Sequence, residues 1–147
     1  MPVQPQPAYD PSNIFARILR GELPAQKIYE DAETLAIMDI MPRADGHCLV
    51  IPKGPARNML DATPEQLAAC IRTVQKVSKA AMAAFAADGI TIQQANETAG
   101  NQLVFHLHYH VLPRHLGRVL KAHTGQMEKP DVLAAHADKL RAALKSL

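Results

Sequence analysis

The sequence predicts an α+β domain built on an antiparallel sheet of about five strands, with one long helix and shorter terminal helices. Short strand-like segments follow one another across turns, with few crossover helices, which favours antiparallel over parallel pairing. One segment after residue 63 has the length and apolar periodicity of a long helix. The 147 residues are enough for one domain with a single substantial core.

The first elements come before the long helix. Residues 1–11 contain four prolines and little to bury, so we expect a flexible N-terminal extension. Asn13 should cap a short helix that runs to Arg20 and ends at Gly21. Three strands are then expected, the first two as a hairpin, over residues 27–30, 34–40 and 47–52.

The long helix has a clear start. A short helical turn is expected at residues 58–61, and Thr63, Pro64 and Gln66 then supply the cap, first and third positions of a helix. Gly89 is expected to end it. Apolar residues recur at helical spacing and predict the face that packs on the sheet: Leu67, Ile71, Val74, Ala81 and Phe85.

Two strands and a helix complete the prediction. The strands are expected over residues 90–96 and 103–113, with a turn at 97–101 between them. The final helix is expected over residues 131–147, behind Pro130. Its apolar face should comprise Leu133, Ala137, Leu140, Leu144 and Leu147.

Composition excludes several classes of protein. A formal charge of +2, with Lys and Arg scattered along the chain, does not predict nucleic-acid binding. There is no apolar stretch near the ~20 residues of a membrane span and no signal-like N-terminus, so a cytoplasmic protein without a membrane partner is expected. Cys48 and Cys70 are expected as small core residues in a reducing compartment.

The strand over residues 103–113 carries three histidines at alternate positions. His106, His108 and His110 would share one face of an extended strand, while Leu107 and its alternate neighbours would face the core. Cα atoms two and four residues apart on a strand are separated by roughly 6.5 and 13 Å, whereas Zn–N bonds are about 2 Å long. One His-x-His pair can chelate a metal, but the third ring cannot easily join it. Three interpretations are open: a solvated polar face, a His-x-His metal site, and imidazoles that act as nucleophile and as acid or base. The pattern favours the third.

Residues 106–112 resemble the signature His-φ-His-φ-His-φ-φ of the histidine triad (HIT) superfamily of nucleotide hydrolases and transferases. Asn96 and Gln102 fit the same pattern. The resemblance covers residues 12–118, the expected HIT domain, and leaves 119–147 as a C-terminal extension whose helix packs on it. Further stretches agree in order and spacing: residues 14–18 with 21–25, residues 36–40 with Pro42, and residues 46–53.

The resemblance implies an enzyme that cleaves a phosphoanhydride or phosphoramidate at the α-phosphate of a purine nucleotide. His108 would attack the phosphorus and form a nucleotidyl-histidine. His47 would support the relay that fixes the tautomer of the nucleophile, and His106 would be the first member of that relay. His110 would contact the leaving-group side of the phosphate.

The resemblance also implies contacts to the rest of the nucleotide. Asn96, Gln102 and the backbone near Leu103 would bind phosphate oxygens. Asp39 would accept hydrogen bonds from the ribose hydroxyls. The base would lie in an apolar slot formed by Ile14, Phe15, Ile18, Ile37 and Ile40. Taken one at a time, these apolar residues would be ordinary core.

Some residues depart from the family pattern. Many bacterial members have a zinc-binding Cys-x-x-Cys where this chain has Asn13 and Ala16, and a histidine where it has Pro55, so we expect no structural zinc and no cofactor. Leu103 replaces a serine usual in Hint-like phosphoramidases, and the chain has no tryptophan, so the subfamily stays open. The family implies a homodimer. Two alternatives remain: a nucleotide-binding scaffold with little turnover, and a zinc protein that uses His106 and His108.

Overall fold

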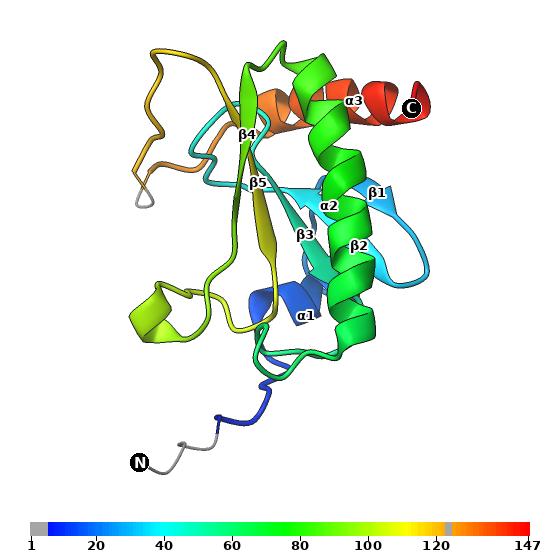
Figure 1. The fold of residues 1–147 in the computed structure, drawn as a ribbon, viewed down its shortest axis with the longest axis vertical. Coiled ribbons are helices and arrows are strands. Elements are labelled where there is room, and N and C mark those ends of the chain that lie inside the picture. Colours follow the sequence, from blue (N-terminus) through cyan, green and yellow to red (C-terminus); the bar gives the residue numbers. More distant parts are fainter. Residues whose placement is uncertain (1–5, 123–124) are drawn as a thin grey trace.

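A computed structural model describes residues 6–122 and 125–147 of the chain. Its centre is a five-stranded antiparallel sheet in the order β1-β2-β3-β5-β4 (Figure 1). The strands are β1 (Lys27–Glu30), β2 (Thr34–Met38), β3 (Cys48–Pro52), β4 (Gly89–Gln93) and β5 (Tyr109–Arg114). The predicted α+β class and antiparallel sheet are confirmed.

Helices cover both faces of the sheet. Helix α2 (Pro64–Ala84) lies across one face, where α3 (Pro130–Lys145) packs against α2 and β1, and α1 (Ile14–Leu19) lies on the other (Figure 1). Strand β2 illustrates the division, because its side chains alternate between two cores. Ala36 and Met38 join the core under α2 and α3, whereas Leu35 and Ile37 pack with Phe15 of α1.

Helix α2 begins as predicted. The Thr63 hydroxyl accepts a hydrogen bond from the Gln66 amide, and the Gln66 side chain accepts one from the Thr63 amide, which is a capping box. The predicted end at Gly89 is wrong. The helix ends at Ala84, Ala86 adopts the left-handed conformation with φ of 48°, and Gly89 begins β4.

The predicted buried face of α2 is only partly right. Val74 and Ala81 are buried, but Ile71 is 52% exposed. Small residues dominate the contact with the sheet, and their small volume lets the helix axis approach it closely. The spacing of the large apolar residues therefore predicted a buried face that is rotated around the helix from the observed one. The buried residues of the helix are Ala69, Cys70, Thr73, Val74, Val77, Ala80 and Ala81.

The prediction of one strand over residues 103–113 is wrong in its first half, because β5 begins at Tyr109. Strand β3 pairs with β5 only from Cys48 to Val50. Beyond that point the Pro52 carbonyl accepts from the His106 side chain, and the Leu107 amide donates to the Ala56 carbonyl. The alternation nevertheless survives, because Leu107, like its alternate neighbours in β5, belongs to the core under α2.

Other boundaries shift for local reasons. Strand β2 ends at Met38, not residue 40, because the Asp39 carboxylate accepts the Met41 amide and turns the chain. Strand β4 ends at Gln93, before the predicted residue 96. The short helical turn predicted at residues 58–61 is confirmed, since the Ala62 amide donates to the Asn58 carbonyl at 3.2 Å. Helix α3 ends at Lys145, so Leu147 is exposed, contrary to prediction. Within residues 6–122 and 125–147, no helix has the length and apolar character needed to cross a bilayer.

Candidate active site

A pocket of about 520 Å³ opens beside α1, between the loop after β2 and the segment that leads into β5. Its wall is mostly apolar. The structure brings together here all the residues predicted to contact the nucleoside, namely Asp39, Ile14, Phe15, Ile18, Ile37 and Ile40. His47, His108 and His110 line the same pocket. An apolar cavity with a few polar groups at one end is typical of a small-molecule site.

His108 is buried and its protonation pattern is fixed by the main chain. Its Nδ1 lies 2.7 Å from the carbonyl oxygen of His106. Because a carbonyl can only accept, Nδ1 carries the proton, and in the neutral ring the lone pair is therefore on Nε2. Phe15 packs edge-on against the ring, with centroids 5.0 Å apart, and burial lowers the pKa of His108. The ring is thus held neutral with a nucleophilic nitrogen.

His106 does not line the pocket. It is fully buried, and its Nε2 donates to the Pro52 carbonyl at 2.8 Å. Its Nδ1 lies 2.6 Å from the Tyr9 hydroxyl. Burial lowers the pKa of His106 to about 4, so the ring is neutral at physiological pH. The structure thus places the His106 carbonyl against the His108 ring and the His106 ring against the N-terminal segment.

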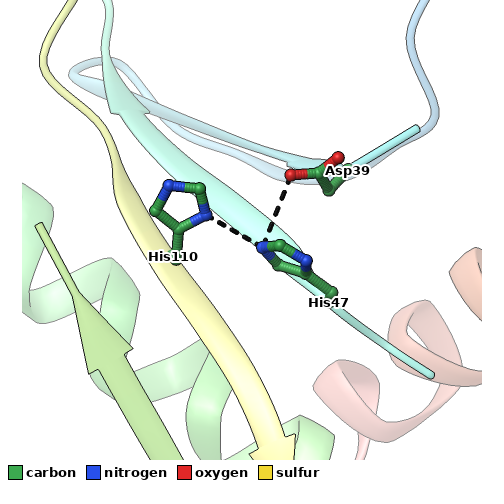
Figure 2. Close-up of side chains that lie close together, drawn as sticks. All are labelled: Asp39, His47 and His110. Atoms are coloured by element: carbon green, nitrogen blue, oxygen red, sulfur yellow. Dashed lines mark hydrogen bonds and ion pairs between the residues drawn. The ribbon is translucent and has the colours of Figure 1, made fainter. Parts of the chain in front are cut away.

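The side chain of His47 contacts that of His110. The Nε2 of His47 lies 2.9 Å from Nδ1 of His110 (Figure 2). The Arg43 amide donates to Nδ1 of His47 at 3.0 Å, so the His47 proton is on Nε2 and points to His110. His110 accepts it at Nδ1, which leaves the proton of the neutral His110 ring on Nε2. The expected support of the nucleophile by the His47 side chain is replaced by the His106 carbonyl.

Asp39 lies beside the same histidine pair. Its Oδ2 is 3.4 Å from Nε2 of His47, and its Oδ1 accepts the Met41 amide at 2.8 Å (Figure 2). The side chain is only 18% exposed, and burial raises the pKa of Asp39 to about 6 against the smaller effect of the Met41 hydrogen bond. A carboxylate at the pocket wall with this ionisation responds to pH near neutrality.

Asp39, His47 and His110 also lie close enough to be considered as metal ligands, since one ligand atom from each falls within 4.8 Å of the others. A neutral imidazole that binds a metal through Nε2 must carry its proton on Nδ1. In His47 that position accepts the Arg43 amide hydrogen. A metal at Nε2 would require a proton on Nδ1, and this proton would clash with the Arg43 amide hydrogen. These donors fit a hydrogen-bond relay and do not fit a metal site.

The two predicted phosphate-binding amides lie outside the pocket wall. Gln102 is buried, with its Nε2 donating to the Arg57 and Val104 carbonyls and its Oε1 accepting the Glu97 amide. Asn96 accepts the Met59 amide and exchanges hydrogen bonds with Gln94. Leu103, which is 75% exposed, does line the pocket. Both amides hold the loops around the pocket in place.

The structure adds residues that sequence reasoning did not single out. Arg43 and Met127 line the pocket, and Tyr9 contacts His106. Met127 belongs to a segment tied to the loop after β2, where the Glu128 amide donates to the Ile40 carbonyl at 2.9 Å. No local motif marks these residues, because each contact joins segments far apart in the sequence.

The fold and the site define a small α+β domain with a histidine-lined pocket of nucleotide size. The HIT domain family profile matches residues 20–117, and the chain belongs to this family. It is 42% identical over 118 residues to an uncharacterized HIT-like protein of Mycobacterium tuberculosis, covering 80% of this chain and 82% of that one. A crystal structure of a HIT-like protein from Bartonella henselae is 49% identical, with a TM-score of 0.89 over 93% of this chain and 99% of that one.

Some relatives carry a named activity, among them an adenylylsulfatase of Arabidopsis thaliana, 37% identical over 101 residues, which cover 69% of this chain and 51% of that protein. The chain is 37% identical over 103 residues to the adenosine 5'-monophosphoramidase of Schizosaccharomyces pombe, which covers 70% of this chain and 74% of that protein. The HIT family therefore includes hydrolases of nucleotide derivatives among the relatives of this chain.

Proposed function

We propose that this protein is a nucleotide hydrolase or nucleotidyl transferase that cleaves a phosphoanhydride or phosphoramidate at the α-phosphate of a purine nucleotide. One observation carries the proposal. The hydrogen bond from His108 Nδ1 to the His106 carbonyl, 2.7 Å long, leaves the Nε2 lone pair of a pocket-lining histidine ready to attack. The phosphoramidase activity of the S. pombe relative supports the same class of substrate.

In the first step, the Nε2 lone pair of His108 forms a bond to the α-phosphorus while the bond from phosphorus to the leaving oxygen or nitrogen breaks. The leaving group keeps the bonding electrons and takes a proton from solvent. The attached His108 ring becomes cationic, and its Nδ1–H continues to donate to the His106 carbonyl, which stabilises that charge.

In the second step, water or another acceptor attacks the phosphorus. The N–P bond breaks, its electrons return to Nε2 of His108, and the proton of the attacking water passes to solvent. A nucleoside monophosphate leaves and the neutral histidine is restored. Because each step forms and breaks one bond to phosphorus, a single histidine serves both.

His110 supports charge at the phosphate. Its ring stands against His108, with centroids 5.0 Å apart. Since His47 donates to its Nδ1, the Nε2–H of His110 is the group that donates to a phosphate oxygen or the leaving atom. Backbone amides near Leu103 are the further phosphate donors that we assign. The Asn96 and Gln102 side chains act indirectly, because they hold in place the loops that carry those amides.

The apolar part of the pocket receives the nucleoside. The Asp39 carboxylate accepts hydrogen bonds from the ribose hydroxyls. The base lies between the side chains of α1 and β2 described above, with Phe15 between the base and His108. Because this wall is apolar, burial of the base supplies most of the binding free energy and few hydrogen bonds are needed.

The test compares His108→Ala with His136→Ala, a control on α3 whose ring packs on Phe85 away from the pocket. We expect the wild type and His136→Ala to turn over adenosine phosphoramidate or diadenosine polyphosphates. His108→Ala should lose at least about a hundredfold in kcat while still binding AMP. Mass spectrometry of the quenched wild type should find a nucleotidyl group on the peptide containing His108.

Two outcomes would contradict the proposal. Full turnover by His108→Ala would exclude the nucleotidyl-histidine. AMP binding by the wild type without turnover of any of these substrates would favour a nucleotide-binding scaffold.

We also propose a homodimer in which β4 of one copy extends the sheet of the other. Within residues 6–122 and 125–147, β4 has only β5 as a strand neighbour, and Ile92 on this edge is 41% exposed. Light scattering should give a dimer for the wild type and for Ile71→Asp, whose site lies on α2, and a monomer for Ile92→Asp. A monomeric wild type would contradict this arrangement.

A further inference from the structure

Tyr9 joins the N-terminal segment to the ring of His106. Its hydroxyl oxygen lies 2.6 Å from Nδ1 of His106, and the two rings meet edge to face with centroids 5.7 Å apart. The segment is anchored at its far end. Asp10 accepts hydrogen bonds from Ser12 and Asn13, and Arg20 donates to the Pro11 carbonyl at 2.8 Å. The contact therefore belongs to an ordered connection onto α1.

The direction of the hydrogen bond follows from the other side of the ring. The Pro52 carbonyl can only accept, so Nε2 of His106 carries the proton. In the neutral ring Nδ1 is then the acceptor, and the Tyr9 hydroxyl is the donor. A chain of hydrogen bonds runs from the Tyr9 hydroxyl through the His106 ring to the Pro52 carbonyl.

We infer that Tyr9 is a positioning residue of the proposed reaction: it holds the His106 ring in one tautomer and orientation, so that the carbonyl of the same residue meets Nδ1 of His108. The inference rests on the proposed function for its effect on rate. Tyr9 itself does not line the pocket and touches no part of the substrate there.

The charge of His106 is the quantity that Tyr9 controls. The groups that act on His106 from the surrounding elements are Tyr9, the Pro52 carbonyl, His108 and Asp61. Burial, the largest effect, keeps its pKa at about 4. Loss of the Tyr9 hydroxyl leaves Nδ1 without its donor, and that atom then takes a proton more readily. A cation at His106 lies next to His108 and opposes the cationic ring that forms during attack.

The experiment compares Tyr9→Phe with the matched variant Tyr29→Phe. The Tyr29 hydroxyl contacts Asp31 and Lys76 at the far side of the fold. The measurement is the single-turnover rate at saturating substrate from pH 4 to 8, beside the ¹⁵N shifts of His106 over the same range. Both variants should melt close to the wild type.

For Tyr9→Phe we expect a rate lower by about 3- to 10-fold near pH 4.5, where His106, with a pKa of about 4, begins to take its proton, because the effect is that of one lost hydrogen bond. The loss should shrink toward pH 8, and KM should not change. The Nδ1 shift of His106 should report a proton at higher pH than in the wild type. Tyr29→Phe should match the wild type in every respect.

An unchanged pH dependence of the rate in a folded Tyr9→Phe protein would overturn the inference. An unchanged His106 shift would overturn it equally. The ¹⁵N titration needs no turnover, so it tests Tyr9 even if the wild type cleaves no substrate. The titration therefore distinguishes a failure of this inference from a failure of the proposed function.

Discussion

The Nε2 atom of His47, the residue just before β3, lies 2.9 Å from Nδ1 of His110 on β5, the strand that pairs with β3. The main-chain amide of Arg43 fixes the direction of this contact by donating to the other nitrogen of His47. The Arg43 amide thus sets the tautomer of His110 indirectly, through His47. The His106 carbonyl sets the tautomer of His108 directly. The rings of His108 and His110 therefore differ in the pocket: Nε2 of His108 can accept a hydrogen bond, whereas Nε2 of His110 can donate one.

Replacement of His47 by Ala should lower kcat by roughly tenfold or more, because His110 loses the donor that fixes its tautomer. Binding of AMP should change little. Steady-state kinetics and calorimetry on His47→Ala measure the two effects. His115→Ala is the matched control, since the His115 ring bonds the Phe85 carbonyl away from the pocket. A weakened AMP affinity with unchanged kcat would contradict this role for His47.

The acidic limb of kcat/KM should report Asp39. Burial raises its pKa to about 6, whereas burial lowers that of His108. As pH falls through about 6, Asp39 becomes protonated and loses its capacity to accept from both ribose hydroxyls. The value of kcat/KM should therefore fall there. In Asp39→Asn the limb near pH 6 should vanish, and a limb that persists unchanged would assign it to another group.

Asp39→Asn should also stabilise the fold at neutral pH. The pKa of Asp39 rises from 3.8 to about 6 on folding, so the free energy of unfolding falls as pH rises through this window. At about 1.4 kcal/mol per pKa unit, ionisation costs about 3 kcal/mol above pH 6. Urea unfolding should find the variant more stable by about that amount at pH 7, with no difference below pH 4. Equal stability at both pH values would contradict the burial argument.

Gly46→Ala should destabilise the protein by about 2 kcal/mol or more, because of backbone strain and overlap. Gly46 has φ of 84°, and an added Cβ would meet Phe85 Cδ2 at 2.7 Å. Because Gly46 precedes His47, activity should fall as well. Gly100→Ala is the control, with no atom within 4 Å of the added Cβ and no positive φ. Thermal melts compare the two variants, and equal melting temperatures would count against the close approach.

Local sequence rules predicted the start of each helix better than the ends of the strands. Thr63 and Gln66 lie within one turn, so their capping box could be read directly. The start of β5 at Tyr109 depends on the His106 side chain, which donates a hydrogen bond to the Pro52 carbonyl, 54 residues away in the sequence. Ile71 was misplaced because packing of small residues, not the spacing of large ones, sets which face of α2 is buried.

The pattern of the HIT family grouped residues that the structure also brings to one pocket. Asp39 and the apolar residues named for the nucleoside all line the cavity. The partners of the side chains were not predicted. Gln102 and Asn96 bond to loop atoms, and His47 contacts His110, because those distances depend on how separate loops meet.

By itself the sequence determined the α+β class, the five antiparallel strands and the alternation that separates the histidines from the core residues between them. These follow from spacing along the chain, which side-chain direction in extended segments translates into faces. Contacts between distant segments fix which nitrogen of His106 and of His110 carries its proton. That choice depends on single donors and acceptors, such as the Pro52 carbonyl, the Tyr9 hydroxyl and the His47 ring, that distant segments bring within about 3 Å.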